Sequence, residues 1–283
     1  MPLDLPVSPL APKTFPDLPT IGGMTALAAR IGLYRGPVRN DLILVHFPEG
    51  AVAAGVFTRS LTASADVQWC RKALKDGGGR ARVLIVNAGN SNAFTGKAGE
   101  EKNAASVAEA VRLTGCAPEE VFLAATGVIG VPLPPRKVAD VVAENWDRLG
   151  TPDIEALARA FMTTDTFAKG AVASAAIGGK TVNIVGIAKG SGMIAPNMAT
   201  MLVYLFTDAD LDPAFAQAAL ATHTETTFNA ITVDGDTSTS DSLMLFATGA
   251  SGAPRVSDPD GADGRAFSHA LHTVMEDLAH QVV

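Results

Sequence analysis

Short runs of apolar residues, separated by glycine, proline and polar residues, alternate along the chain with longer amphipathic stretches. Runs of this length predict β-strands. Residues 41–47 (DLILVHF) and 52–58 (VAAGVFT) are two such runs, and the Pro-Glu-Gly at 48–50 predicts a turn between them. Further strands are predicted at residues 83–87, 121–125, 182–187, 201–207, 231–233 and 243–247. The segment before residue 41 is broken by proline and glycine and predicts an irregular lead-in.

Helices are predicted where apolar residues recur every three to four positions, as they do over residues 104–111. Asp212 followed by Pro213 predicts another helix start, because aspartate caps a helix N-terminus and proline is tolerated at the first position. The same period predicts helices around residues 138–149, 154–161 and 267–278. Because many strands are adjacent in sequence, the order favours a layered α+β domain over strict alternation of strand and helix.

Composition narrows the class of protein. Of the 283 residues, 47% are apolar and 18% are charged, which indicates a packed core rather than a disordered chain. The net charge of −7, without a basic cluster, argues against binding to nucleic acid or to an anionic membrane surface. No apolar stretch is long enough to span a membrane and the N-terminus lacks signal-peptide features, so we expect a cytoplasmic protein. Cys70 and Cys116 are expected to be buried thiols.

Two loops fall short of known ligand motifs. Gly89 and Gly96-Lys97 are separated by six residues, whereas a phosphate-binding loop needs four. Residues 234–241 alternate oxygen ligands as a calcium loop does, but Thr239 and Leu245 stand where an EF-hand needs glycine and glutamate. We therefore interpret both as polar turns.

One predicted helix carries side chains of a kind that could bind a metal. His269, His272 and Glu276 are spaced at i, i+3 and i+7. The apolar stripe of the same helix faces the opposite way, so we expect these three side chains to face solvent. The sequence therefore predicts no metal site.

The most chemically varied segment is residues 186–202, GIAKGSGMIAPNMATML, between two predicted strands. A threonine hydroxyl is a weak nucleophile unless a base lies beside it. If the chain is cut before Thr200, the new α-amino group, with a pKa of about 8, supplies that base. The small side chain of Ala199 leaves the scissile carbonyl accessible. These features indicate an N-terminal threonine nucleophile at Thr200.

With this segment, the chain resembles the ornithine acetyltransferase family, the glutamate N-acetyltransferases of arginine biosynthesis. The matching segments cover most of the chain and occur in the family's order: AGVFT at 54–58, VNAGNSNAFTG at 86–96, ATGVIGVP at 125–132, FMTTDTF at 161–167, residues 186–202, and FNAITVDGDTSTSD at 228–241.

The resemblance implies a fold and a processing event. The implied fold is an αββα sandwich, in which helices enclose two layers of sheet. Self-cleavage between Ala199 and Thr200 would divide the precursor into an α chain, residues 1–199, and a β chain that begins with residues 200–283. The two fragments are expected to stay together, as an α2β2 assembly.

The resemblance also implies roles for individual residues. Thr200 is the implied nucleophile and contacts the substrate, and the Thr126 hydroxyl and Gly127 N–H form the implied oxyanion hole. Thr166 and Lys189 match substrate-binding positions. The chemistry agrees, because a tetrahedral oxyanion needs fixed donors. Lys189 can pair with a substrate carboxylate and favour a neutral amine on Thr200.

The implied reaction transfers acetyl from N2-acetyl-L-ornithine to L-glutamate through an acetyl-threonine enzyme. No cofactor is implied, although acetyl-CoA is an alternative acetyl donor within the family. Two other functions remain open: an N-terminal-nucleophile amidase or aminopeptidase on the same scaffold, and a structural homologue without activity.

The chain departs from the family pattern in three places. The family has STG where this chain has Ala125-Thr126-Gly127, and STND where it has serine at Ser240. Family members also continue past Val283 into a segment with an acidic active-site residue, and they end near an active-site asparagine. We therefore expect residues 1–283 alone to be inactive and less stable than a longer chain.

Overall fold

A computed structural model describes residues 6–34, 38–194 and 201–283. Within these ranges, the strands form one mixed sheet in the order β4-β3-β2-β8-β7-β6-β5, with β1 paired to β2. The strands are β1 Thr25–Ala29, β2 Leu42–Phe57, β3 Arg80–Asn90, β4 Val121–Val128, β5 Lys169–Ile177, β6 Lys180–Lys189, β7 Leu202–Thr207 and β8 Ser242–Ala247. The helices are α1 Ala65–Asp76, α2 Lys97–Thr114, α3 Lys137–Asn145, α4 Ile154–Ala160, α5 Pro213–Thr226 and α6 Ala262–Val282, with 3₁₀ turns at Pro118–Glu120, Trp146–Arg148 and Phe228–Ala230.

Strand β2 joins the two halves of this sheet. Its residues 42–46 pair with β1 and β3, and its residues 52–57 pair with β8. The pairing register with β3 shifts between His46 and Ala51. The predicted turn at 48–50 is therefore wrong, since the chain continues through it as one strand of 16 residues. Pro48 cannot donate to a ladder, and it is accommodated where the ladder is already interrupted.

The sheet curls so that one of its faces encloses a central core. Phe122 of β4 and Phe246 of β8 have ring centroids 5.9 Å apart, although β3 and β2 lie between their strands. In a flat sheet, three strand spacings would separate them by about 14 Å. Phe47 and Phe206 also stack on Phe246. This central core therefore lies between the two halves of one folded sheet.

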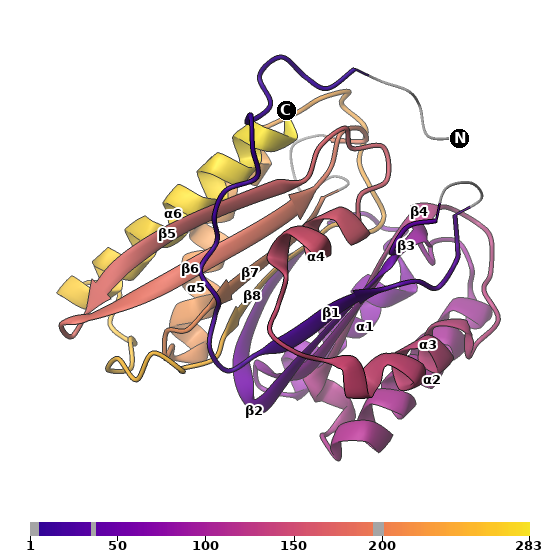
Figure 1. Ribbon diagram of the computed structural model, residues 1–283, viewed down its shortest axis with the longest axis horizontal. Coiled ribbons are helices and arrows are strands. Elements are labelled where there is room, and N and C mark those ends of the chain that lie inside the picture. The colour runs from indigo at the N-terminus through magenta and orange to yellow at the C-terminus, as the bar shows by residue number, and fades with distance from the viewer. Residues whose placement is uncertain (1–5, 35–37, 195–200) are drawn as a thin grey trace.

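The opposite face of the sheet is covered by helices. Alternate residues of β2, β3 and β4 point away from the central core and pack with α2 and α3. Those of β6, β7 and β8 pack with α5 and α6. Figure 1 shows these two helix pairs against the two halves of the sheet. The layers therefore run helix, sheet, sheet, helix, which is the order expected for an αββα sandwich.

Several elements differ from the sequence predictions. Residues 231–233 do not form a strand, because the Val233 N–H and the Thr232 hydroxyl both donate to the Ile194 carbonyl. The helix predicted over 138–149 ends at Asn145. Strands β1 and β5 and helix α1 were not predicted. Both cysteines are buried thiols, as expected.

No helix in the described ranges is long and apolar enough to cross a membrane.

Replacing Phe246 by alanine is expected to lower the free energy of unfolding by about 3–5 kcal/mol, the usual cost of removing a buried phenylalanine. Phe246 is fully buried, stacks on the rings of Phe47 and Phe206, and meets the Phe122 ring edge-on. Phe94→Ala is the matched control, because Phe94 is 65% exposed and its loss should cost less than about 0.5 kcal/mol. Urea unfolding of both variants measures the difference, and equal losses would contradict the position of the central core.

Candidate functional site

Two of the residues singled out from the sequence meet between the sheet halves. Thr126 lies near the end of β4 and Lys189 ends β6, and the Lys189 Nζ donates to the Thr126 Oγ1 over 3.1 Å. Both residues follow the strand alternation that places Phe122 and Ile187 in the central core, so both point inward. Four strands separate β4 from β6 in the sheet. Curling of the sheet therefore creates this contact.

Asp165 lies near Lys189 and hydrogen-bonds to both β5 and the segment that follows β6. Its Oδ1 accepts from the Lys169 Nζ at 2.6 Å and from the backbone N–H of Gly190 at 2.7 Å. Its Oδ2 accepts from the Thr163 N–H at 3.1 Å. The Asp165–Lys169 ion pair is buried, with side chains 0% and 2% exposed. Through Gly190, the carboxylate holds the backbone that carries Lys189.

Burial and neighbouring charges shift the pKa values of Lys189 and Asp165. Desolvation lowers the pKa of Lys189 below its usual value, and the charge of Lys169 acts in the same direction, while Asp165 and Asp241 oppose it. Burial would raise the pKa of Asp165, but the charges of Lys189 and Lys169 outweigh it and hold that pKa below its usual value. Asp165 is therefore an anion at neutral pH.

A second buried carboxyl, Asp241, lies just before β8. Its Oδ1 accepts from the Met201 N–H at 2.8 Å, and its Oδ2 has no hydrogen-bond partner among the described residues. Burial raises the pKa of Asp241 well above its usual value, although the Met201 and Ser238 hydrogen bonds and the Lys189 charge act against it. Sequence reasoning assigned no role to Asp165 or Asp241, although both lie inside matching segments. The pKa shifts that single out these two carboxyls arise from burial, which the sequence does not show.

The backbone at Gly127 leaves no room for a side chain. Its φ is +124°, and a Cβ built there would lie 2.5 Å from the Gly89 carbonyl carbon and 2.8 Å from the Asn90 nitrogen. The following residue, Val128, has its carbonyl held by the Ser91 N–H and hydroxyl, each at 3.0 Å. Glycine is required here because β3 and β4 approach closely.

The remaining predicted site residues are placed differently. Thr166 is half-buried and lines a surface hollow with Lys13, Phe15 and Gln281. Its neighbour Asp165, in contrast, pairs with Lys169 and lies near Lys189. Ala199 and Thr200 lie outside the described residues, and the described chain resumes at Met201. Their roles stay predictions.

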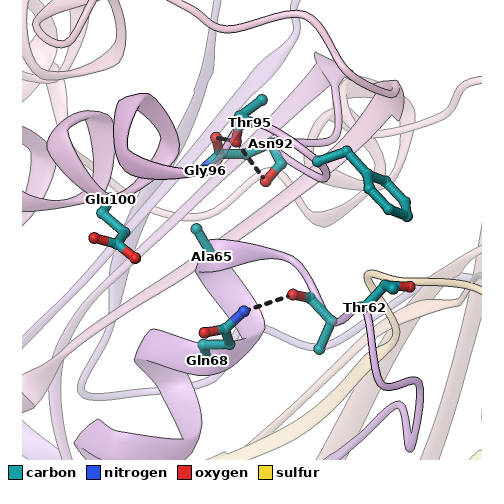
Figure 2. Close-up of a pocket in the computed structure, with 9 residues that line it drawn as sticks. Thr62, Ala65, Gln68, Asn92, Thr95, Gly96 and Glu100 are labelled. Carbon is teal, nitrogen blue, oxygen red and sulfur yellow. Dashed lines mark hydrogen bonds between the residues drawn. The ribbon is translucent and has the colours of Figure 1, made fainter.

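Another hollow opens between the N-terminal ends of α1 and α2. Figure 2 shows its lining, with the Gln68 amide donating to the Ala63 carbonyl and Thr95 bonded to Asn92. Behind it, Asn92 donates to Asp66, which forms a buried ion pair with Lys102 at 2.9 Å. None of the predicted site residues lines this hollow.

The histidines of α6 do not assemble a metal site. His269 and Glu276 are exposed as expected, whereas His272 is half-buried against the His223 ring, with centroids 5.1 Å apart. Over the described ranges, no three His, Cys, Asp or Glu side chains are grouped to hold a metal ion.

Comparisons with known proteins agree with this architecture. The family model described as the ArgJ family matches residues 25–283. The arginine biosynthesis bifunctional protein ArgJ of Bradyrhizobium diazoefficiens is 50% identical over 279 residues, and the match covers 98% of this chain and 67% of that protein. The crystal structure of ornithine acetyltransferase from Mycobacterium tuberculosis, complexed with ornithine, superposes with a TM-score of 0.51 at 30% identity, covering 64% of this chain and 94% of that chain.

A more distant structure supports the fold alone. The L-aminopeptidase D-Ala-esterase/amidase of Ochrobactrum anthropi, a variant of the Ntn hydrolase fold, superposes with a TM-score of 0.54 at 13% identity, covering 96% of this chain and 88% of that chain. The expected layered α+β sandwich is thus confirmed.

Proposed function

Because the chain belongs to the ArgJ family of arginine-biosynthesis enzymes, we propose that residues 1–283, together with the C-terminal segment that family members carry, transfer acetyl from N2-acetyl-L-ornithine to L-glutamate through a covalent acetyl group on Thr200. The observation that carries the proposal is the contact between Lys189 and Thr126 inside the folded sheet, 3.1 Å long and shielded from water. It joins an implied substrate-binding residue to an implied oxyanion donor.

The Thr126 hydroxyl has the geometry of a donor to an oxyanion. Its oxygen accepts a hydrogen bond from the Lys189 Nζ, so the hydroxyl hydrogen of Thr126 is free to point elsewhere. The Gly127 N–H follows it directly on a backbone that only glycine can adopt. Two such fixed donors stabilise the charge that develops on a tetrahedral intermediate.

In the proposed reaction, self-cleavage before Thr200 exposes its α-amino group. That amine takes the hydroxyl proton as Oγ attacks the acetyl carbonyl of N-acetyl-ornithine. The intermediate collapses, the C–N bond breaks, and the departing amine of ornithine takes the proton. The glutamate amine then attacks the acetyl ester by the same steps in reverse, so that the ester C–O bond breaks, N-acetyl-glutamate is released and the Thr200 hydroxyl regains its proton.

The buried charges favour substrates that carry a carboxylate. Lys169 is paired with Asp165, whereas Lys189 forms no ion pair with a carboxylate among the described residues. A protonated lysine in a buried site is stabilised by an anionic partner. Acetyl-ornithine and glutamate both carry an α-carboxylate, so one pocket can bind each in turn.

The remaining features of the proposal follow the family. They are an α2β2 assembly of residues 1–199 with the chain that starts at Thr200, no cofactor, and acetyl-CoA as an alternative donor. An amidase or aminopeptidase would share the acyl-enzyme and differ in passing the acyl group to water. Release of free acetate instead of N-acetyl-glutamate would identify that alternative.

Steady-state kinetics are expected to be ping-pong. Because ornithine must leave before glutamate enters the same pocket, double-reciprocal plots at several glutamate concentrations should be parallel. Labelled ornithine should also exchange into N-acetyl-ornithine in the absence of glutamate. Intersecting lines without such exchange would indicate a ternary complex and contradict the acetyl-enzyme.

A further inference from the structure

Two buried lysines, Lys169 at the start of β5 and Lys189 at the end of β6, lie near the Asp165 carboxylate. Lys169 and Lys189 are each no more than 2% exposed, and Asp165 is the anion that faces both. The other carboxyl near Lys189 is Asp241, whose pKa burial raises well above its usual value. Among the described residues, Asp165 is the carboxylate that pairs with a lysine here, and its partner is Lys169 rather than Lys189.

The geometry shows how Asp165 divides its contacts. Its Oδ1 bonds the Lys169 Nζ at 2.6 Å and the Gly190 N–H at 2.7 Å, and no direct bond to the Lys189 Nζ is present. Lys169 is held further by the face of the Phe167 ring, 4.6 Å from its centroid. Lys189 instead reaches the Thr126 hydroxyl.

We propose that Asp165 is a positioning residue: it neutralises Lys169 and fixes Gly190, and it thereby leaves Lys189 charged and free to bind a carboxylate of the substrate. The effect of this role on catalysis rests on the proposed function. The pairing of Asp165 with Lys169 rather than with Lys189 does not depend on that function. Asp165 contacts no reacting atom, and it acts only through the two lysines and the Gly190 backbone.

Substitutions of Asp165 and of Lys169 should shift the pKa of Lys189 in opposite directions. Asp165→Asn removes the negative charge that favours the ammonium form, so Lys189 should lose its proton at lower pH. Lys169→Met removes a like charge and frees Asp165 to pair with Lys189, so Lys189 should keep its proton to higher pH. Close charges commonly move a neighbour's pKa by about 1–3 units, which is large enough to resolve.

Lysine side-chain NMR on protein labelled with ¹³C at lysine Cε measures this directly, with Lys189→Met used to assign the signal. We expect the Lys189 titration midpoint to fall in Asp165→Asn and to rise in Lys169→Met. Lys102→Met is the matched control. It breaks a buried ion pair of similar exposure at 2.9 Å, and it should lower stability without moving the Lys189 midpoint.

Kinetics provide the second measurement. The alkaline limb of kcat/KM should move with the NMR midpoint, to lower pH in Asp165→Asn and to higher pH in Lys169→Met. In Lys169→Met, KM for glutamate should rise more than kcat falls, because Asp165 then competes with the substrate carboxylate.

Midpoints that move in the same direction in both variants, or that do not move, would overturn the proposal. If Asp165→Asn does not fold, Lys169→Met alone decides, since the proposal requires an upward shift there. Opposite NMR shifts in a protein that transfers no acetyl would support the pairing of Asp165 with Lys169 and refute the proposed function instead.

Discussion

Thr200→Ala is expected to remain a single polypeptide and to lose acetyl transfer by at least about 10³-fold, because in the proposed mechanism this side chain both initiates cleavage and acts as the nucleophile. Denaturing mass spectrometry of the wild-type protein should show a fragment that begins at Thr200, and the variant should show the uncut mass. Acetyl transfer is followed by formation of N-acetyl-glutamate.

Thr200→Ser is the matched control for this experiment. Serine keeps the hydroxyl and would keep the α-amino base after cleavage, so it should still be cut and should retain part of the activity. Efficient cleavage of Thr200→Ala would contradict the role of this hydroxyl in self-processing. Full activity in an uncut protein would contradict the N-terminal nucleophile.

Gly127→Ala is expected to lower kcat by about 10²–10³-fold, because the proposed mechanism uses the Gly127 N–H as an oxyanion donor and losing one such donor usually costs that much. A methyl group there would lie 2.5 Å from the backbone of Gly89, at a φ of +124°. Strands β3 and β4 must therefore separate, which turns the Gly127 N–H away from its present direction. The melting temperature should fall as well, because the clash is with backbone atoms that cannot rotate away.

Gly130→Ala is the control that distinguishes the effect of a steric clash from the effect of backbone strain at a positive φ. Gly130 also has a positive φ, +78°, but a Cβ there would have no atom within 4 Å. This variant should lose some stability, since a left-handed conformation costs a non-glycine residue about 1 kcal/mol or more, and it should keep kcat within a few-fold of the wild type. Equal loss of kcat in both variants would show that any strain in this loop disrupts the site.

Local sequence patterns predicted helices and strands correctly where no contact with a distant strand acted against them. The strand over 121–125 and the helix over 104–111 were found within longer elements, β4 and α2. The Asp212 cap was found at the start of α5, where its carboxylate accepts from the Ala214 and Phe215 N–H groups. These signals depend only on residues that are close in sequence, so they can be recognised without knowledge of the tertiary structure.

Predictions failed where distant strands decided the outcome. The turn signal at 48–50 was overridden because β2 forms ladders with β3 on one side and with β8 on the other. Residues 231–233 had a strand pattern but join no strand of the sheet, because the Val233 N–H and the Thr232 hydroxyl donate to the Ile194 carbonyl instead. Strand β5 was missed because its buried positions are mostly alanine and glycine, which favour no single structure.

The sequence by itself determined the family, the layered α+β class, the Thr200 nucleophile as a hypothesis, and the glycine at 127, because each depends on residue types in a local order. Only the tertiary structure decided which charged groups lie together. Lys189, Thr126 and Asp165 come from segments far apart in the chain, and the curled sheet brings them to one buried place. The pKa shifts of Lys189 and Asp165 follow from exclusion of water and from the charges packed near them, and neither condition exists before the chain has folded.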